Sequence, residues 1–268
     1  MITIQHTLCT MLATGCDQEY LDRYIAAILL PDAIRFYTKN RKLSHFEMKS
    51  DGTDCSYMTF PSDMKALSPV TIAQALGKNS HLVEEAACVI GEQTNENEFA
   101  RHNLGLPPVM FRGILLHLWQ DQIFDDFIRK MIDCDRRYED VFVLRNGREV
   151  DGKEVRSVIA TIEHEGFWVL ADMLRQSSGI VFNQEWLDKN LYPVLVREYP
   201  KELAENTYKY MQIPAEIDAK ITAGVSPRDE DLTCGITVAE FTALYESVVQ
   251  KMLDDCEVAA YYGKNSGM

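Results

Sequence analysis

The feature that most constrains the fold is a long apolar run in the middle of the chain. Pro107-Pro108 opens this run, which extends from Val109 to about Cys134 and is rich in Leu, Ile, Phe and Trp. The apolar residues fall on most sides of a helix rather than along one stripe, which is typical of a helix enclosed by other elements. We therefore expect a central buried helix over about 109–134.

Helical patterns dominate the rest of the chain as well. Helices are expected over Asp17–Leu30 (ending at Pro31), Pro69–Leu76, His81–Ile90, Glu154–Gln176, Gln184–Met211 (interrupted near Pro193 and Pro200) and Thr237–Ala260. Over 141–155 the pattern breaks at Asn146-Gly147, and an Asn-Gly pair between apolar residues is typical of a β-hairpin. The sequence predicts an all-α fold: a single multi-helical domain over 1–268 with one small hairpin near 141–155 and a flexible tail at 260–268.

Composition narrows the classes of function. Asp and Glu number 41 against 27 Lys and Arg in 268 residues, so the formal net charge is −14. This charge argues against bulk nucleic-acid binding and against docking on an anionic membrane, although a local basic patch or a bound metal can still accept an anionic substrate. Seven cysteines without a C-x-x-C pair indicate a reducing compartment. Without a leader-like start or an apolar run long enough to span a bilayer, we expect a cytoplasmic protein.

The central run also carries the residues best suited to chemistry. Gly113, His117 and Asp121 follow one another at intervals of four, and Asp125 continues the series. Residues four apart lie on one helix face, about 6 Å apart along the axis, so an imidazole and a carboxylate can bind one divalent ion. An ionised carboxylate in apolar surroundings is costly unless it is paired or bound to a metal. A metal site and a buried structural His–Asp pair both satisfy this pattern.

Three shorter motifs precede the central run. His6 lies close to the N-terminus, ahead of a stretch that contains Leu and Ala. Asp32 follows Pro31 at the end of an apolar helix, and His45 precedes Phe46. Asp32 could simply cap a following helix, and His45 could lie in a surface loop.

In this order the motifs resemble the zinc-dependent phospholipase C family and its nuclease relatives, over roughly residues 1–130. The resemblance implies that one zinc is surrounded by Asp32, His45, His117 and Asp121. It also implies that Asp121 bridges to a second zinc, which His6 holds, and that Asp32 acts as the general base. Neutral imidazoles and carboxylates are donors that suit zinc.

The chain departs from the family's pattern after the central run. The family's third zinc takes two further His and a Glu, the last His and the Glu being four apart, but Trp168 occupies the position four after His164. Asp125 could replace the missing His, while His164 could equally lie on a solvated helix face. We therefore expect one or two zinc ions, with Asp125 and His164 as additional candidate ligands. The ligand set does not exclude Mn or Fe.

A basic segment lies between the Pro-Asp and His-Phe motifs. Its Arg35, Lys39 and Arg41 could hold a substrate phosphate, or could form an ordinary exposed loop. The sequence thus predicts a zinc-dependent hydrolase of phosphate esters, specifically a phosphodiesterase that acts on a small soluble substrate with a metal-activated water as nucleophile. The alternative is a non-catalytic helical binding protein with at most one structural metal.

Overall fold

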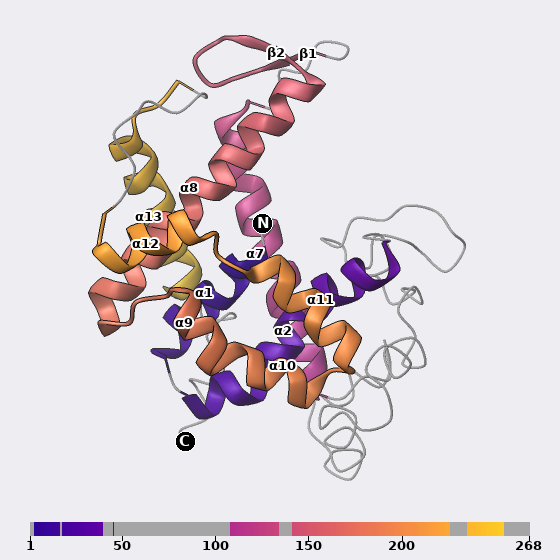
Figure 1. Ribbon diagram of the computed structural model, residues 1–268. Coiled ribbons are helices and arrows are strands. Elements are labelled where there is room, and N and C mark those ends of the chain that lie inside the picture. Colours follow the sequence, from indigo (N-terminus) through magenta and orange to yellow (C-terminus); the bar gives the residue numbers. More distant parts are fainter. Residues whose placement is uncertain are drawn as a thin grey trace. The chain divides into compact units, whose positions relative to one another are not determined.

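The computed structural model describes residues 3–16, 18–39, 45, 108–133, 141–225 and 235–254 (Figure 1). These residues are mostly helical apart from one small hairpin, which confirms the predicted all-α class. The elements in chain order are α1 (Thr3–Thr14), α2 (Gln18–Thr38), α7 (Pro108–Met131), β1 (Val141–Val143), β2 (Glu149–Asp151), α8 (Gly152–Ser178), α9 (Gln184–Trp186), the π-helical turn η3 (Leu187–Leu191), α10 (Tyr192–Glu198), α11 (Lys201–Met211), α12 (Ala215–Ala223) and α13 (Val238–Asp254). The helices predicted over 69–76 and 81–90 and the predicted tail lie outside the described residues.

The chain divides into two compact units that interleave along the sequence. Unit 1 comprises Met1–Cys16, Gln120–Asn183 and Pro214–Met268, and unit 2 comprises Asp17–Trp119 and Gln184–Ile213. The division falls inside α7, which is one continuous helix. The single domain expected from the sequence stays a prediction. Among the helices in the described ranges, none is both long enough and apolar enough to cross a bilayer.

Unit 1 is built on the long helix α8, against which α1 and α13 pack. The Asp151 side chain caps the start of α8 by accepting hydrogen bonds from the backbone N–H groups of Glu154 and Lys153. These two bonds lower the pKa of the Asp151 carboxyl, because they stabilise its ionised form. Gly179 ends the helix in a left-handed conformation with φ 73°. Both ends of α8 are therefore set by local sequence.

The hairpin precedes α8 as predicted. Strands β1 and β2 are antiparallel, with Val141 opposite Asp151 and Val143 opposite Glu149. Gly147 has a φ of 83°, a value that glycine adopts without steric cost. The predicted Asn-Gly turn therefore connects the two strands.

Unit 2 packs α2 against α10 and α11, which lie beside it in Figure 1. The prediction that the helix ends at Pro31 is wrong, because Pro31 lies inside α2 and the helix continues to Thr38. Asp32 is consequently a residue of the helix interior and not an N-cap. A proline inside a helix costs about 3 kcal/mol. Every residue from 24 to 34 is buried, and this burial offsets the cost.

The helices predicted after α8 are confirmed only in part. Pro200 separates α10 from α11 as expected. Near Pro193 the α-helix is interrupted as expected, by the π-helical turn η3, and Pro193 itself lies in the first turn of α10, where its missing N–H is not needed. Helix α12 was not expected from the sequence.

Candidate metal centre

Three residues predicted as metal ligands meet inside unit 2. Asp32 comes from α2 and His117 from α7, while His45 belongs to the chain between these helices. His45 Nε2 lies 3.2 Å from His117 Nε2 and 3.6 Å from Asp32 Oδ1. All three residues are buried, with at most 1% of their surface exposed. We call these residues the Asp32 cluster.

Two of the three separations in this cluster match those between ligands of one metal ion. Zn–N and Zn–O distances near 2.0–2.1 Å in a tetrahedral site place neighbouring ligand atoms about 3.3 Å apart. The two separations given above, 3.2 and 3.6 Å, lie on either side of that value. Two imidazole nitrogens and one carboxylate oxygen form a donor set typical of zinc. Buried His and Asp side chains of this chain are therefore placed closely enough to hold a metal ion.

The backbone of α2 fixes the orientation of the His117 ring. His117 Nδ1 lies 3.0 Å from the carbonyl oxygen of Ile28, which can only accept, so Nδ1 donates. The neutral ring then presents the lone pair of Nε2 to His45 and to any bound ion. Metal-binding histidines usually donate their other ring N–H to a carbonyl or a carboxylate in this way.

Gly113 allows this hydrogen bond to form. It lies one turn before His117, on the same face of α7. A Cβ atom at position 113 would lie 2.5 Å from the carbonyl carbon of Ala27 and 2.8 Å from the backbone nitrogen of Ile28. Only glycine lets α7 approach α2 this closely. The glycine of the sequence motif therefore has a packing role that serves the site.

Pro31 in α2 leaves a backbone carbonyl without its helical hydrogen bond, close to the carbonyl that orients His117. Pro31 has no N–H to donate to the carbonyl of Ala27. On either side of Ala27, the carbonyl of Ala26 accepts a hydrogen bond from the buried Tyr199 hydroxyl and that of Ile28 accepts the one from His117. Burial raises the pKa of Tyr199, as do the nearby carboxylates of Glu198 and Asp32. Tyr199 thus stays protonated and donates to α2.

A second pair of predicted ligands meets inside unit 1. His6 of α1 and Asp121 of α7 are both buried, with His6 Nε2 3.4 Å from Asp121 Oδ1. His6 Nδ1 donates to the Gln120 side-chain oxygen at 2.7 Å, which turns Nε2 towards Asp121. Sequence reasoning missed Gln120, although a polar residue in the most apolar helix was an available signal.

One helix carries both groups. His117 and Asp121 lie four residues apart on α7. This spacing agrees with the prediction that the two side chains share one helix face. The described structure therefore brings together Asp32, His45 and His117, pairs His6 with Asp121, and places Asp121 one turn from His117.

Two additional candidate ligands lie apart from these groups. Within the described ranges, the sets of residues close enough to share an ion include neither Asp125 nor His164. The His164 side chain is 49% exposed on α8, with its Nδ1 4.0 Å from Glu165. Asp125 is half-buried on α7.

The predicted phosphate-binding residues have different surroundings. Arg35 is partly exposed, and its Nη1 lies 3.6 Å from Asp32 Oδ1. Lys39 is exposed at the end of α2, with its ammonium over the ring of Tyr210. Arg41 lies outside the described residues.

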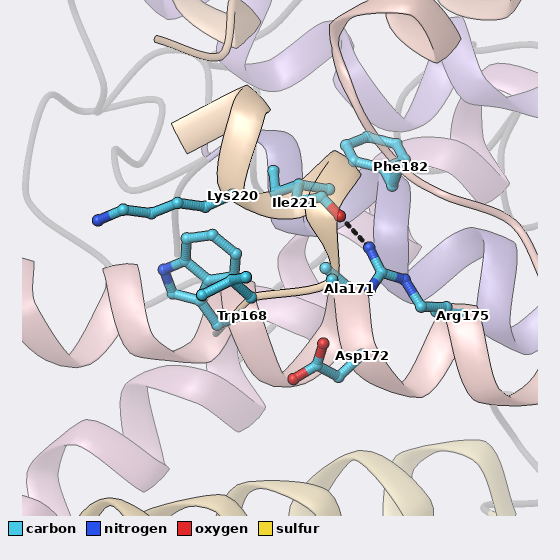
Figure 2. Close-up of a pocket in the computed structure, with 9 residues that line it drawn as sticks. Trp168, Ala171, Asp172, Arg175, Phe182, Lys220 and Ile221 are labelled. Carbon is cyan, nitrogen blue, oxygen red and sulfur yellow. Dashed lines mark hydrogen bonds between the residues drawn. The ribbon is translucent and has the colours of Figure 1, made fainter. Parts of the chain in front are cut away.

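A small pocket lies elsewhere, inside unit 1 between α8 and α12 (Figure 2). Trp168, which occupies the position where the family pattern expects a Glu, forms part of its wall. Arg175 crosses it to donate a hydrogen bond to the carbonyl of Ile221, near the end of α12. None of the predicted site residues lines this pocket. The Arg175 guanidinium therefore caps the C-terminal end of α12.

Comparison with protein-family models, curated proteins and solved structures found no match for this chain.

Proposed function

We propose that this chain is a zinc-dependent hydrolase of phosphate esters, with a phosphodiester as its substrate. The observation that carries the proposal is the Asp32 cluster, in which His45 Nε2 lies at zinc-ligand separations from both His117 Nε2 and Asp32 Oδ1. Asp121, one turn along α7 from His117, is the fourth ligand in this proposal. His6 and Asp121, 3.4 Å apart, offer donors for a second ion.

A bound zinc ion supplies an acidified water molecule and stabilises negative charge on phosphoryl oxygens. The protein's own groups supply the remaining functions. Asp32 is the candidate general base, as the resemblance to the zinc-dependent phospholipase C family implies, and its carboxylate lies among the candidate ligands. Arg35 is 43% exposed and extends from the surface to a carboxylate that is 2% exposed. A guanidinium in this position can bind a phosphate oxygen next to the reacting centre.

A second function has one observation in its favour. The residues of the Asp32 cluster are almost completely buried, as are His6 and Asp121. Complete enclosure by protein ligands is typical of structural zinc sites, whereas catalytic sites keep one position for water or substrate. The alternative is therefore a non-catalytic helical protein with a structural metal.

Metal analysis and hydrolysis assays together test the proposal. We expect the purified protein to contain one or two zinc ions per chain and to hydrolyse bis(p-nitrophenyl) phosphate. The His117→Ala variant should lose zinc, because it removes a central ligand. The Asp32→Asn variant should lower kcat by at least about 100-fold, the usual contribution of a general base.

Asp126→Asn is the matched control, because Asp126 is an exposed acid on the same helix as Asp121. It should retain zinc and activity, whereas Asp121→Asn should lose both. His164→Ala should also retain its zinc. Zinc bound without hydrolysis of any phosphomonoester or phosphodiester would favour the structural alternative, and a protein that binds no zinc would refute the zinc-dependent hydrolase.

A further inference from the structure

Aromatic rings and cations gather on the surface of unit 2 beside the Asp32 cluster. The residues are Arg35, Phe36, Tyr37 and Lys39, at the end of α2, and Tyr210 on α11, and we call them the α2–α11 surface. Tyr37 and Tyr210 are 54% and 56% exposed, unusually high values for large aromatic side chains. Phe36 and Tyr210 stack with ring centroids 3.8 Å apart and planes 15° apart. The surface thus presents a flat, rigid aromatic platform.

Each ring of the platform has its own cation. The Arg35 guanidinium lies 5.9 Å from the centre of the Phe36 ring, and the Lys39 ammonium lies 5.9 Å from the centre of Tyr210. A spacing of 3.8 Å leaves no room for an ammonium between the stacked rings, so Lys39 lies over the outer face of Tyr210. Both distances fall within the range of cation–π attraction.

The platform is connected to the candidate metal centre by direct contacts. Tyr210 stacks on Phe36, Arg35 lies over Phe36, and Arg35 reaches the Asp32 carboxylate at 3.6 Å. Arg35 therefore belongs both to the platform and to the candidate centre. A molecule whose phosphate contacts Arg35 would have its attached group next to the platform.

The end of α2 sets the position of Lys39. Lys39 follows the last residue of α2 with a φ of 58°, in the left-handed region that favours glycine. Its N–H donates to the carbonyl of Arg35 at 2.9 Å. Cys16 and Asp133, which follow α1 and α7, also adopt a positive φ. The residue that ends α2 in this way carries the cation that lies over the exposed Tyr210 ring.

We propose that the α2–α11 surface recognises the substrate through an aromatic ring attached to its phosphate. The substrate class is thus a phosphate ester that carries a planar aromatic group, either a nucleobase or a simpler aryl group. The ring stacks on the outer face of Tyr210, where the Lys39 ammonium now lies, and the ammonium pairs with the anion. This inference rests on the proposed function in treating the bound molecule as a substrate.

The chemistry of the surface favours a planar ring over an alkyl chain. A planar ring such as a nucleobase stacks on an exposed aromatic side chain, whereas an alkyl chain gains no comparable contact from a flat ring. Two cations provide local charge complementarity to an anion in a chain with a net charge of −14. A phosphate with an attached ring satisfies both features at once.

The test compares two phosphonates that differ only in the ring. Binding of phenylphosphonate and methylphosphonate to the full-length, metal-free protein is measured by calorimetry. Their C–P bonds are not hydrolysed, so the result does not depend on catalysis. We expect phenylphosphonate to bind about tenfold more tightly.

Variants of the α2–α11 surface separate the contribution of the aromatic ring to binding from that of the charge. Tyr210→Ala should abolish the preference for phenylphosphonate, and Tyr210→Phe should retain it. Lys39→Ala should weaken the binding of both phosphonates and leave their ratio unchanged. Val196→Ala, at another exposed apolar position of the same unit, is the control and should change neither affinity.

A second pair of ligands shows which kind of aromatic ring the surface recognises. A preference for adenosine 5′-monophosphate over ribose 5-phosphate would assign it to a nucleobase. If only the phenylphosphonate preference were seen, the ring would be a simpler aryl group, and both results support the inference. Equal affinities for the two phosphonates, or a preference that survives Tyr210→Ala, would overturn it. Selective binding without hydrolysis in the zinc-loaded protein would instead refute the proposed function alone.

Discussion

Lys39 occupies a backbone position where glycine would be more stable. A left-handed conformation costs a residue with a side chain about 1–2 kcal/mol, and the position just after a helix is where glycine is most favoured. Lys39→Gly should therefore raise the free energy of unfolding by about 1 kcal/mol, measured by urea denaturation. The same variant should weaken phosphonate binding, because it removes the ammonium over Tyr210.

Lys39→Ala is the matched control for this residue. It removes the same charge but keeps a Cβ in the left-handed conformation, so its stability should stay close to that of the wild type. If Lys39→Gly and Lys39→Ala were equally stable, backbone strain at residue 39 would not be the cause.

The candidate ligands could be found from the sequence because they are polar residues in apolar surroundings. His117 and Asp121 interrupt the most apolar helix, and the structure buries both. The partner of His117 Nδ1 could not be found in this way, because it is the backbone carbonyl of Ile28. Every residue has a carbonyl group, so no pattern of side chains identifies the one that orients a ring.

The contact between α2 and α7 can be tested through Gly113. Alanine favours a helix over glycine by about 1 kcal/mol, but a Cβ at position 113 would lie 2.5 Å from atoms of Ala27. Gly113→Ala should therefore lower the free energy of unfolding by about 1–3 kcal/mol. It should also weaken zinc binding by at least about tenfold, because it displaces the carbonyl that orients His117.

Gly152→Ala is the control for this contact. Gly152 is the first residue of α8, and nothing lies within 4 Å of a Cβ placed there. Its replacement should leave zinc affinity unchanged and stability equal or slightly higher. Equal effects of the two substitutions on zinc affinity would refute a specific role for close packing at Gly113.

Element boundaries were predictable where local chemistry sets them. Helix α8 was expected over 154–176 and extends over 152–178, because Asp151 and Gly179 cap its two ends. Helix α2 was expected to end at Pro31. It continues to Thr38 because the burial of residues 24–34 offsets the cost of a proline inside a helix. Helix α12 had start and stop signals in Pro214 and Gly224, but its only buried residue is Ile221, so it shows little apolar periodicity.

At the scale of the whole molecule, each unit combines segments that are distant in sequence. Helix α1 packs on α8 in unit 1, and the Gln5 side chain donates to the carbonyl of Glu163, 158 residues away. Helix α2 packs on α10 and α11 in unit 2. Hydrophobic periodicity identifies such helices but not their partners, because many apolar faces are interchangeable. The sequence could therefore predict the all-α class and not the grouping of its helices.

A zinc ion at the Asp32 cluster would join chain segments that are otherwise far apart. His45 and His117 alone are separated by 72 residues. An ion that binds the folded chain and not the unfolded chain stabilises the fold by about 2.7 kcal/mol at a free concentration 100 times its Kd. Removing zinc with a chelator should therefore lower Tm, and adding zinc back should restore it.

The variants decide where this stabilisation arises. His45→Ala and His117→Ala should have the same Tm with and without zinc, because each removes a ligand of the cluster. Asp126→Asn should respond to zinc as the wild type does. If the His117→Ala variant gained as much from zinc as the wild type, the ion would bind elsewhere on the chain. The burial of the Asp32 cluster would then have to be explained by the hydrogen bonds and ion pairs among its own side chains, which link α2 and α7 without a metal.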